Sequence, residues 1–217
     1  EIDGAEARDV EAIRVGKQAE LANLAEYGVY RTVPREESLG KKYVTTRWEV
    51  QRRDGGTWRC RFVAREFNRV DRTRDDLYTP CSSTAMGRVI DFIATAKRNP
   101  RAVLDAVCAY FNARKDEECY VEPPIEWVEQ RREAGFSDDV VWRLERQLYG
   151  RRKASRMFYE HASTILKELK FEQCLEQPQF WTRSVDEVDV ELHQDDIHCT
   201  APTEGLGKFI SEFSAVM

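Results

Sequence analysis

The sequence lacks the features of a membrane, secreted or zinc-binding protein. Its most apolar stretch, 102–111, is interrupted by Asp105 and is far shorter than the ~20 residues of a bilayer-spanning helix. The chain opens without a basic and apolar leader, so nothing favours secretion. Its six cysteines form no Cys-x-x-Cys pair and no Cys/His spacing typical of zinc. We therefore expect no membrane span, an intracellular location and free thiols at Cys60, Cys81, Cys108, Cys119, Cys174 and Cys199.

Charge is distributed unevenly along the 217 residues. The net charge of -5 by itself disfavours nucleic-acid binding. The 41% of hydrophobic residues indicates a globular chain, and the length fits one domain or two small lobes. Between Lys41 and Arg74, however, eleven Lys and Arg face four Asp and Glu, a balance of +7. The segment Arg146–Arg156 adds five cations and no acid. The sequence therefore predicts two basic surfaces on an otherwise acidic chain.

The N-terminal part predicts a helix followed by a two-stranded ribbon. Apolar residues at helical spacing indicate a helix over about 5–27. Residues 43–51 and 57–65 alternate in polarity, and Asp54-Gly55-Gly56 between them suits a tight hairpin. The period of two predicts an arginine face opposite Trp58 and Phe62, formed by Arg59, Arg61 and Arg65.

The remainder alternates between strand and helix patterns. Ser82, Ser83 and Thr84 can cap a helix that should be largely buried. Strands are expected at 103–107, as a short buried strand, and at 120–121, 140–144, 180–183, 188–192 and from 197, with a second helix at 157–169 and a polar loop around 131–139. The order strand, helix, strand, strand, helix predicts an α+β fold of the split βαβ, ferredoxin-like kind.

Three aspartates carry the candidate chemistry. Asp105 lies in the apolar strand, and Asp195 and Asp196 lie where one strand should turn into the next. A buried carboxylate is costly unless it is paired or bound to a metal, and carboxylate oxygens suit Mg²⁺. If the three converge, they can hold two Mg²⁺ ions about 4 Å apart. The alternative for Asp195 and Asp196 is an ordinary solvated turn. His193 and His198 flank this turn, and they are either ligands of a transition-metal site or ordinary polar positions.

Six segments in series resemble the fingers and palm of copia-type retrotransposon reverse transcriptases. The first is the fingers strand, and the second contains the first catalytic aspartate. The last has His193-Gln194-Asp195-Asp196 in place of the catalytic Tyr-Val-Asp-Asp. In order they are 58–67, 104–112, 119–124, 148–156, 177–180 and 193–196. The resemblance implies an RNA-directed DNA polymerase that uses two Mg²⁺ ions, or Mn²⁺, with template-primer and deoxynucleotides as partners.

The resemblance also implies a role for each matching residue. Asp105 and Asp195 would ligate both metals, the Ala106 carbonyl would hold the nucleotide-side metal, and Asp196 would support the site. Tyr110 would lie under the incoming sugar and favour deoxynucleotides; the other interpretation is a plain core aromatic. The triphosphate would be clamped by Arg59 and Arg52, unless these are a solvated ribbon face, and template and primer would contact Tyr149, Gly150, Arg151, Arg152 and Lys153.

Departures from the family pattern leave a second hypothesis open. His193 and Gln194 replace Tyr-Val, Val107 replaces the usual Lys, Ala113 stands where Gly is common, and Ser155 replaces Pro. We expect one reverse-transcriptase-like domain over 1–217, with about 1–100 mainly fingers and about 101–217 mainly palm, ending before a thumb. The alternative is a relic of the fold that no longer catalyses and serves as a scaffold subunit in a larger protein assembly.

Overall fold

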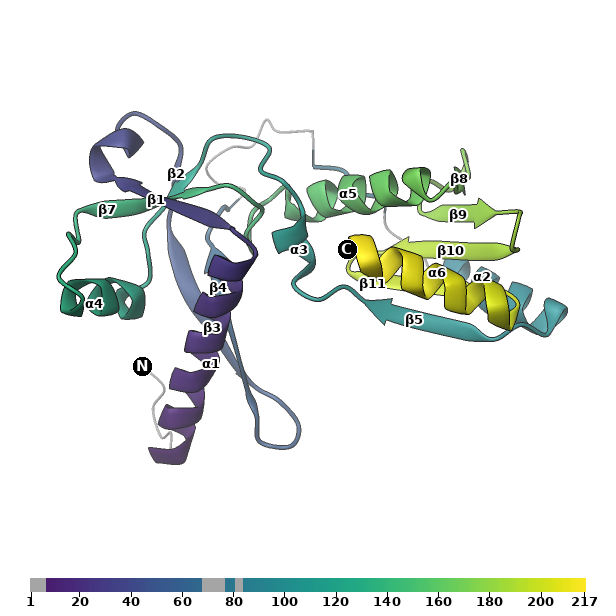
Figure 1. Ribbon diagram of the computed structural model, residues 1–217, viewed down its shortest axis with the longest axis horizontal. Coiled ribbons are helices and arrows are strands. Elements are labelled where there is room, and N and C mark those ends of the chain that lie inside the picture. The colour runs from purple at the N-terminus through teal and green to yellow at the C-terminus, as the bar shows by residue number, and fades with distance from the viewer. Residues whose placement is uncertain (1–6, 68–76, 81–83) are drawn as a thin grey trace. The chain divides into compact units, whose positions relative to one another are not determined.

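The chain forms two compact units, which are described one at a time (Figure 1). The computed structural model describes residues 7–67, 77–80 and 84–217. The first unit contains 1–74 and 113–154, and the second contains 75–112 and 155–217. The sequence suggested one division near residue 100, but 113–154 belong with the N-terminal part because their strands pair with strands from it. No described helix is long and apolar enough to cross a bilayer, and the α+β class is confirmed.

The first unit has a four-stranded sheet in the order β1-β7-β6-β2. Only β2 and β6 pair in parallel. The loop expected around 131–139 is preceded by a helix that the sequence pattern did not reveal, because none of its residues is buried and it has no apolar stripe. The bounds are β1 Tyr30–Pro34, the 3-10 helix η1 Arg35–Ser38, β2 Tyr43–Val44, β6 Tyr120–Val121, α4 Ile125–Glu133 and β7 Val140–Leu144.

The expected N-terminal helix and two-stranded ribbon are both present. Helix α1 spans Ala7–Glu26, and the antiparallel strands β3 (Thr46–Arg52) and β4 (Trp58–Ala64) form the ribbon. Helix α1 packs closely on the ribbon, since a Cβ at Gly16 would lie 2.9 Å from Cys60 Sγ. This close approach gives the ribbon one face covered by α1 and one polar face.

A buried carboxylate links α1 to β4. Glu20 is only 7% exposed, and its Oε1 accepts a hydrogen bond from Phe62 N at 3.2 Å. Burial raises the pKa of Glu20 from 4.5 to about 7, although the Phe62 N–H and the charge of Arg61 act in the opposite direction. The folded unit therefore binds a proton that the unfolded chain has already released between these two pH values.

Replacing Glu20 with Gln should stabilise the chain at pH 8. Since the folded pKa is raised, the contribution of Glu20 to stability is fully present below pH 4.5 and is lost as the pH rises through about 7. The pKa shift corresponds to about 3 kcal/mol of destabilisation at pH 8. We expect Glu20→Gln to raise the free energy of unfolding by about 2 kcal/mol, because the buried Gln amide still needs hydrogen-bond partners. Urea unfolding at several pH values tests this. Glu11→Gln, which alters an exposed partner of Arg14 on the same helix, should leave the loss of stability between pH 4.5 and 8 unchanged.

The second unit has a five-stranded antiparallel sheet in the order β5-β11-β10-β9-β8. Helices α5 and α6 cover one face, because alternate strand residues such as Val190, Leu192 and Ile197 join Leu166 and Phe209 in one buried cluster. The bounds are β5 Arg101–Asp105, α3 Ala109–Asn112, α5 Ala154–Glu168, β8 Glu172–Gln173, β9 Phe180–Arg183, β10 Val188–His193, β11 Asp196–Thr200 and α6 Thr203–Val216.

Helix α2, Thr84–Lys97, lies on the opposite face of this sheet, behind it in Figure 1. Lys97 Nζ is 3.5 Å from Glu187 Oε2, and Ile90 and Ala94 are buried. The expectation of a largely buried helix was wrong, because Phe92 is 73% exposed. One sheet surface covers one side of a helix only, whereas the apolar residues of α2 extend around it. The expected caps Ser82 and Ser83 lie outside the described residues.

Candidate active site

The β10–β11 hairpin brings the aspartates to one end of the sheet. Its two-residue turn is Gln194-Asp195, and Gln194 has a φ of +56°. Strand β11 then pairs with β5 so that Asp196 lies directly opposite Asp105. Ala106 N donates a hydrogen bond to Asp195 O at 3.1 Å. Segments ninety residues apart in the sequence therefore meet through backbone pairing.

The burial expected for Asp105 was wrong. Strand β5 is an edge strand whose residues alternate between exposed and half-buried, and Asp105 is exposed, as is Val103 at 64%. The apolar letters around Asp105 indicated a buried strand. Helices α5 and α6 cover one face of the sheet, and on the other face α2 packs on β10 and β11, which leaves the edge strand β5 open. The cost of burying a carboxylate therefore does not argue for a cation at Asp105. The argument that remains is the direct pairing of two carboxylates.

The paired carboxylates suit a hard divalent cation by their chemistry and placement. Directly opposed residues of antiparallel strands carry their side chains on the same face, with Cβ atoms about 5 Å apart. Asp105 and Asp196 therefore present oxygen donors that can share one ion. Over the described residues, no three His, Cys, Asp or Glu side chains gather into a metal-binding group. The donor set of the pair, which consists of carboxylate oxygens, fits Mg²⁺.

The two histidines lie on the same face as the aspartate pair. The rings of His193 and His198 are 6.4 Å apart, and His198 Nδ1 is 3.2 Å from Glu191 Oε2. They occupy diagonal positions on adjacent strands. They do not form a transition-metal group with a third ligand in the part of the chain that the structure describes. The interpretation as polar positions of the sheet is the one that the geometry supports.

A hollow of about 860 Å³ lies between α2 and this sheet face. It is lined by both histidines and the fully buried Glu191, together with Gly87, Arg88, Ile90, Asp91, Arg101, Ala102 and Val103. Sequence analysis missed Glu191 and α2 as parts of this site. The only signal was an acid whose sequence neighbours Val190 and Leu192 are both apolar.

Tyr110 lies on the short helix α3 and packs against α5. Its hydroxyl is 3.1 Å from Ser155 Oγ, and its ring meets Phe158 edge to face with centroids 6.3 Å apart. The ring is half-buried. The packing matches the core interpretation of Tyr110, while the remaining exposure leaves a surface that a sugar can contact.

The ribbon separates the two arginines expected to clamp a triphosphate. Arg59 lies opposite Gln51 in the register, and Arg61 lies opposite Glu49, so these residues share the polar face. Arg52 pairs with Trp58 on the other face, where its guanidinium lies 6.0 Å from the Trp58 ring centroid. The expected arginine face is confirmed for Arg59 and Arg61. Arg52 cannot join Arg59 on one ligand while the ribbon keeps this register.

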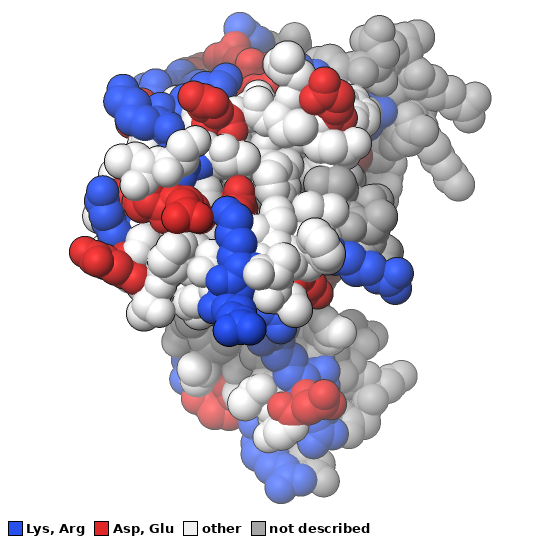
Figure 2. Space-filling model, turned by 90° about the vertical axis from the view of Figure 1, so that its right-hand side faces the viewer, with Lys and Arg blue, Asp and Glu red and all other residues white. Residues whose placement is uncertain are grey.

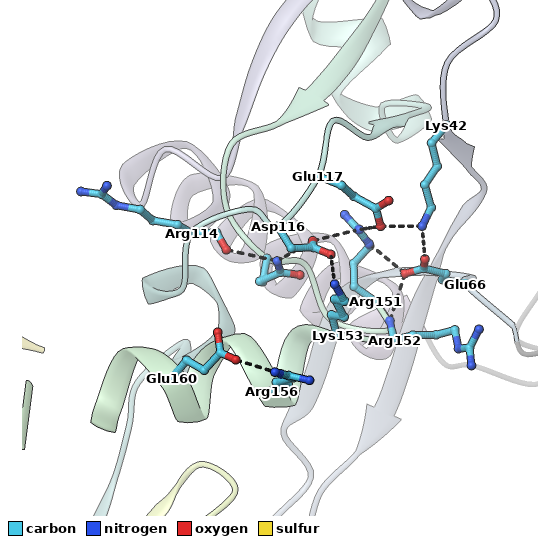
Figure 3. A network of polar contacts seen from close by, with 11 residues as sticks. Lys42, Glu66, Arg114, Asp116, Glu117, Arg151, Arg152, Lys153, Arg156 and Glu160 are labelled. Atoms are coloured by element: carbon cyan, nitrogen blue, oxygen red, sulfur yellow. Dashed lines mark hydrogen bonds and ion pairs between the residues drawn. The ribbon is translucent and has the colours of Figure 1, made fainter. Parts of the chain in front are cut away.

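The expected template-side segment, 149–153, is joined to the end of β4. Ala64 N donates to Tyr149 O at 2.7 Å, and Gly150 has a φ of +79°. A Cβ at Gly150 would lie 2.1 Å from Ala64 O, so only glycine fits. Figure 3 shows the guanidinium of Arg151 among carboxylates, and its side chain is fully buried. Arg151 therefore does not reach a template strand in this conformation.

The two basic surfaces counted from the sequence are partly neutralised by acids from elsewhere in the chain. Lys42 pairs with Glu66 and Glu117, and Lys153 lies 3.6 Å from Asp116. Figure 2 shows Lys and Arg interspersed with Asp and Glu on the face that it draws. Three of the counted cations, Arg69, Arg72 and Arg74, lie outside the described residues. A local count of charges therefore overstates how basic these segments are.

Comparison with known proteins defines the class. The family model described as reverse transcriptase (RNA-dependent DNA polymerase) matches residues 27–213, so the chain belongs to the reverse transcriptase family. Within that family it is of the copia type. The chain is 28% identical over 102 residues to the putative transposon Ty5-1 protein of Saccharomyces cerevisiae. That match covers 46% of this chain and 32% of the yeast protein, so the chain spans about a third of this relative's length.

Proposed function

We propose that this chain is the nucleotide-transferring part of a copia-type retroelement's RNA-directed DNA polymerase. The second unit corresponds to the palm and the ribbon of the first unit to the fingers. The observation that carries the proposal is the direct pairing of Asp196 with Asp105, beside the Asp195–Ala106 backbone hydrogen bond. A cross-strand pair of carboxylates beside the turn of a hairpin is an unfavourable arrangement of like charges, which a cation between them would relieve.

The proposed roles follow from these positions. Asp105, Asp195 and Asp196 hold Mg²⁺, or Mn²⁺ in its place, with the Ala106 carbonyl as a further oxygen donor. When bound, the metal neutralises phosphate charge and lowers the pKa of the attacking hydroxyl. Tyr110 contacts the incoming sugar and excludes its 2′-hydroxyl. The partners are a template-primer duplex and a deoxynucleoside triphosphate.

Primer extension is the direct test of this proposal. The chain should add deoxynucleotides to a primer annealed to an RNA template when Mg²⁺ is present, and EDTA should stop the reaction. Ribonucleotides, which carry a 2′-hydroxyl, should be incorporated more slowly than deoxynucleotides, and Tyr110→Ala should reduce that discrimination. Absence of incorporation with either metal, by a chain that is folded and binds the duplex, would contradict the proposal and leave a scaffold role.

The two faces of the ribbon provide a matched pair of variants. Arg59→Ala should raise the KM for the deoxynucleotide by roughly tenfold to a hundredfold, because a hydrogen bond to a charged group contributes about 1.5–3 kcal/mol. Arg52→Ala removes the same charge from the face that carries Trp58 and should leave KM within about twofold. Steady-state kinetics at saturating template-primer measures both values. Equal KM values for the two variants would show that Arg59 does not bind the triphosphate.

A further inference from the structure

Glu66 is a buried acceptor at the junction between the ribbon and the segment 149–153. Its side chain is 9% exposed, and its Oε2 accepts hydrogen bonds from Arg151 Nε at 2.9 Å and from Arg152 N at 3.0 Å. Lys42 Nζ donates to its other oxygen. Burial alone would raise the pKa of Glu66, but these three donors outweigh burial and lower it to about 2. Glu66 is therefore a carboxylate at any physiological pH.

Arg151 is held from its other side by the loop after Ala113. Arg151 Nη2 lies 3.3 Å from Asp116 Oδ1 and 3.0 Å from Glu117 Oε1, and the Arg151 side chain is fully buried. Asp116 Oδ1 also accepts a hydrogen bond from Gln147 Nε2 at 3.0 Å. Figure 3 shows this network converging on the Arg151 guanidinium while Arg152 extends away from it. Arg151 is therefore the centre of a buried ion network.

This burial decides what Arg151 can do. To reach a nucleic-acid phosphate, the guanidinium would have to leave Glu66, Asp116 and Glu117. One exposed phosphate contact does not offset the loss of a buried network in which three carboxylates surround one guanidinium. The network instead holds the backbone of Tyr149 and Gly150 against β4. Ala64 N donates to Tyr149 O, and Glu66, two residues after Ala64, accepts from Arg152 N.

A hollow of about 290 Å³ opens beside this backbone. Arg47, Arg61 and Arg65 line it together with Tyr149, Gly150 and Glu66. The Arg61 guanidinium lies 4.6 Å from the Tyr149 ring centroid, which presents a charged and an aromatic surface side by side. Such a lining fits a single nucleic-acid strand, because cations contact phosphates and aromatic rings stack on bases.

We infer that Glu66 and Arg151 are positioning residues that shape this hollow for a nucleic-acid strand. Glu66 borders the hollow, but its carboxylate oxygens accept from Lys42, Arg151 and Arg152 N and do not bind the strand. The inference rests on the proposed function, because it takes the template as the ligand. It also separates Arg151 from Arg152 and Lys153, which the sequence grouped with it as template contacts. The adjacent carboxylate Glu49 provides the matched comparison, since it lines the same hollow but is exposed and pairs with Arg47 at 2.6 Å.

The test compares the affinity of variants for a labelled single-stranded RNA by fluorescence anisotropy. Each of Glu66→Gln and Glu49→Gln removes one negative charge near the same polyanion, so charge alone predicts tighter binding for both. We expect Glu49→Gln to bind the RNA equally or more tightly, and Glu66→Gln to bind it about tenfold more weakly because the segment at Gly150 is released. Glu66→Asp keeps the charge but shortens the reach, and it should also weaken binding. If Glu66→Gln does not fold, Glu66→Asp is compared with Glu49→Gln in its place.

Non-additivity distinguishes positioning from contact. In the Glu66→Gln background, Arg151→Met should cause no further loss of RNA affinity, because the two residues act as a unit. If Arg151 contacted a phosphate, Arg151→Met would still weaken RNA binding in this background. The substitution would also reduce the slope of log affinity against log salt by about 0.7 for a single strand. Tighter binding by both Gln variants, or persistence of the Arg151→Met loss, overturns the inference and leaves the proposed function intact. Failure of the unaltered, folded chain to bind RNA overturns both.

Discussion

Replacing Asp105 with Asn is expected to lower the rate of nucleotide incorporation by at least about a thousandfold. The amide keeps the size of the carboxylate but removes the charge that a divalent cation needs. A loss of about 4 kcal/mol of metal-dependent stabilisation corresponds to three powers of ten in rate. Asp105 is exposed, so the free energy of unfolding should change by only about 0.5 kcal/mol.

The control for Asp105→Asn lies on the same sheet. Asp189→Asn alters an acid of β10 on the same face, at the end of the hairpin away from the turn, and should retain near-normal incorporation. Single-nucleotide incorporation under Mg²⁺ saturation, with unfolding measured in parallel, compares the two variants. If Asp105→Asn and the unaltered chain give equal product, the paired carboxylates have no part in catalysis and the proposed mechanism is wrong.

Replacing Gly150 with Ala should produce a large loss of stability. Its φ of +79° strains any L-residue by about 1–2 kcal/mol, and its Cβ would meet Ala64 O at 2.1 Å, which forces β4 and the segment apart at a further cost of about 1–3 kcal/mol. The expected decrease in the free energy of unfolding is therefore about 3 kcal/mol or more. The hydrogen bond from Ala64 N to Tyr149 O should be lost as well.

Gly55 separates the two contributions to the Gly150 effect. It has a similar φ of +87° in the ribbon turn, but nothing lies within 4 Å of a Cβ placed there. Gly55→Ala therefore carries the backbone strain alone and should lose only about 1 kcal/mol. Denaturant unfolding of the two variants gives the comparison. Equal losses would mean that the contact with Ala64 relaxes without cost, and the close approach would then have no structural importance.

The sequence located most of the elements because local patterns act over a few residues. Strand β9 begins and ends at the residues expected, and β10 differs by one residue at His193. The ribbon follows from alternation and from Asp54-Gly55-Gly56, and α5 follows from an apolar stripe at helical spacing. Helix α4 was missed because it buries none of its residues, so its sequence has no stripe to detect.

The errors share one physical cause, which is that local patterns do not show what covers a residue. Asp105 was expected to be buried because its neighbours are apolar, yet β5 is an edge strand. The family resemblance implied that Arg151 contacts a template, yet Glu66, Asp116 and Glu117 come from distant parts of the chain and surround it. The resemblance also implied that Arg52 and Arg59 clamp one triphosphate, although the ribbon's period of two places them on opposite faces.

By itself, the sequence determined the α+β class, the order of the elements and membership of the copia-type reverse transcriptases, because each depends on local periodicity or on motifs in series. Only the tertiary structure decided which residues meet. The pairing of Asp196 with Asp105, the burial of Arg151 and the hollow beside Gly150 all depend on contacts between segments far apart in the chain. Backbone pairing and buried ion networks select those contacts, and they leave no signature in the residues on either side.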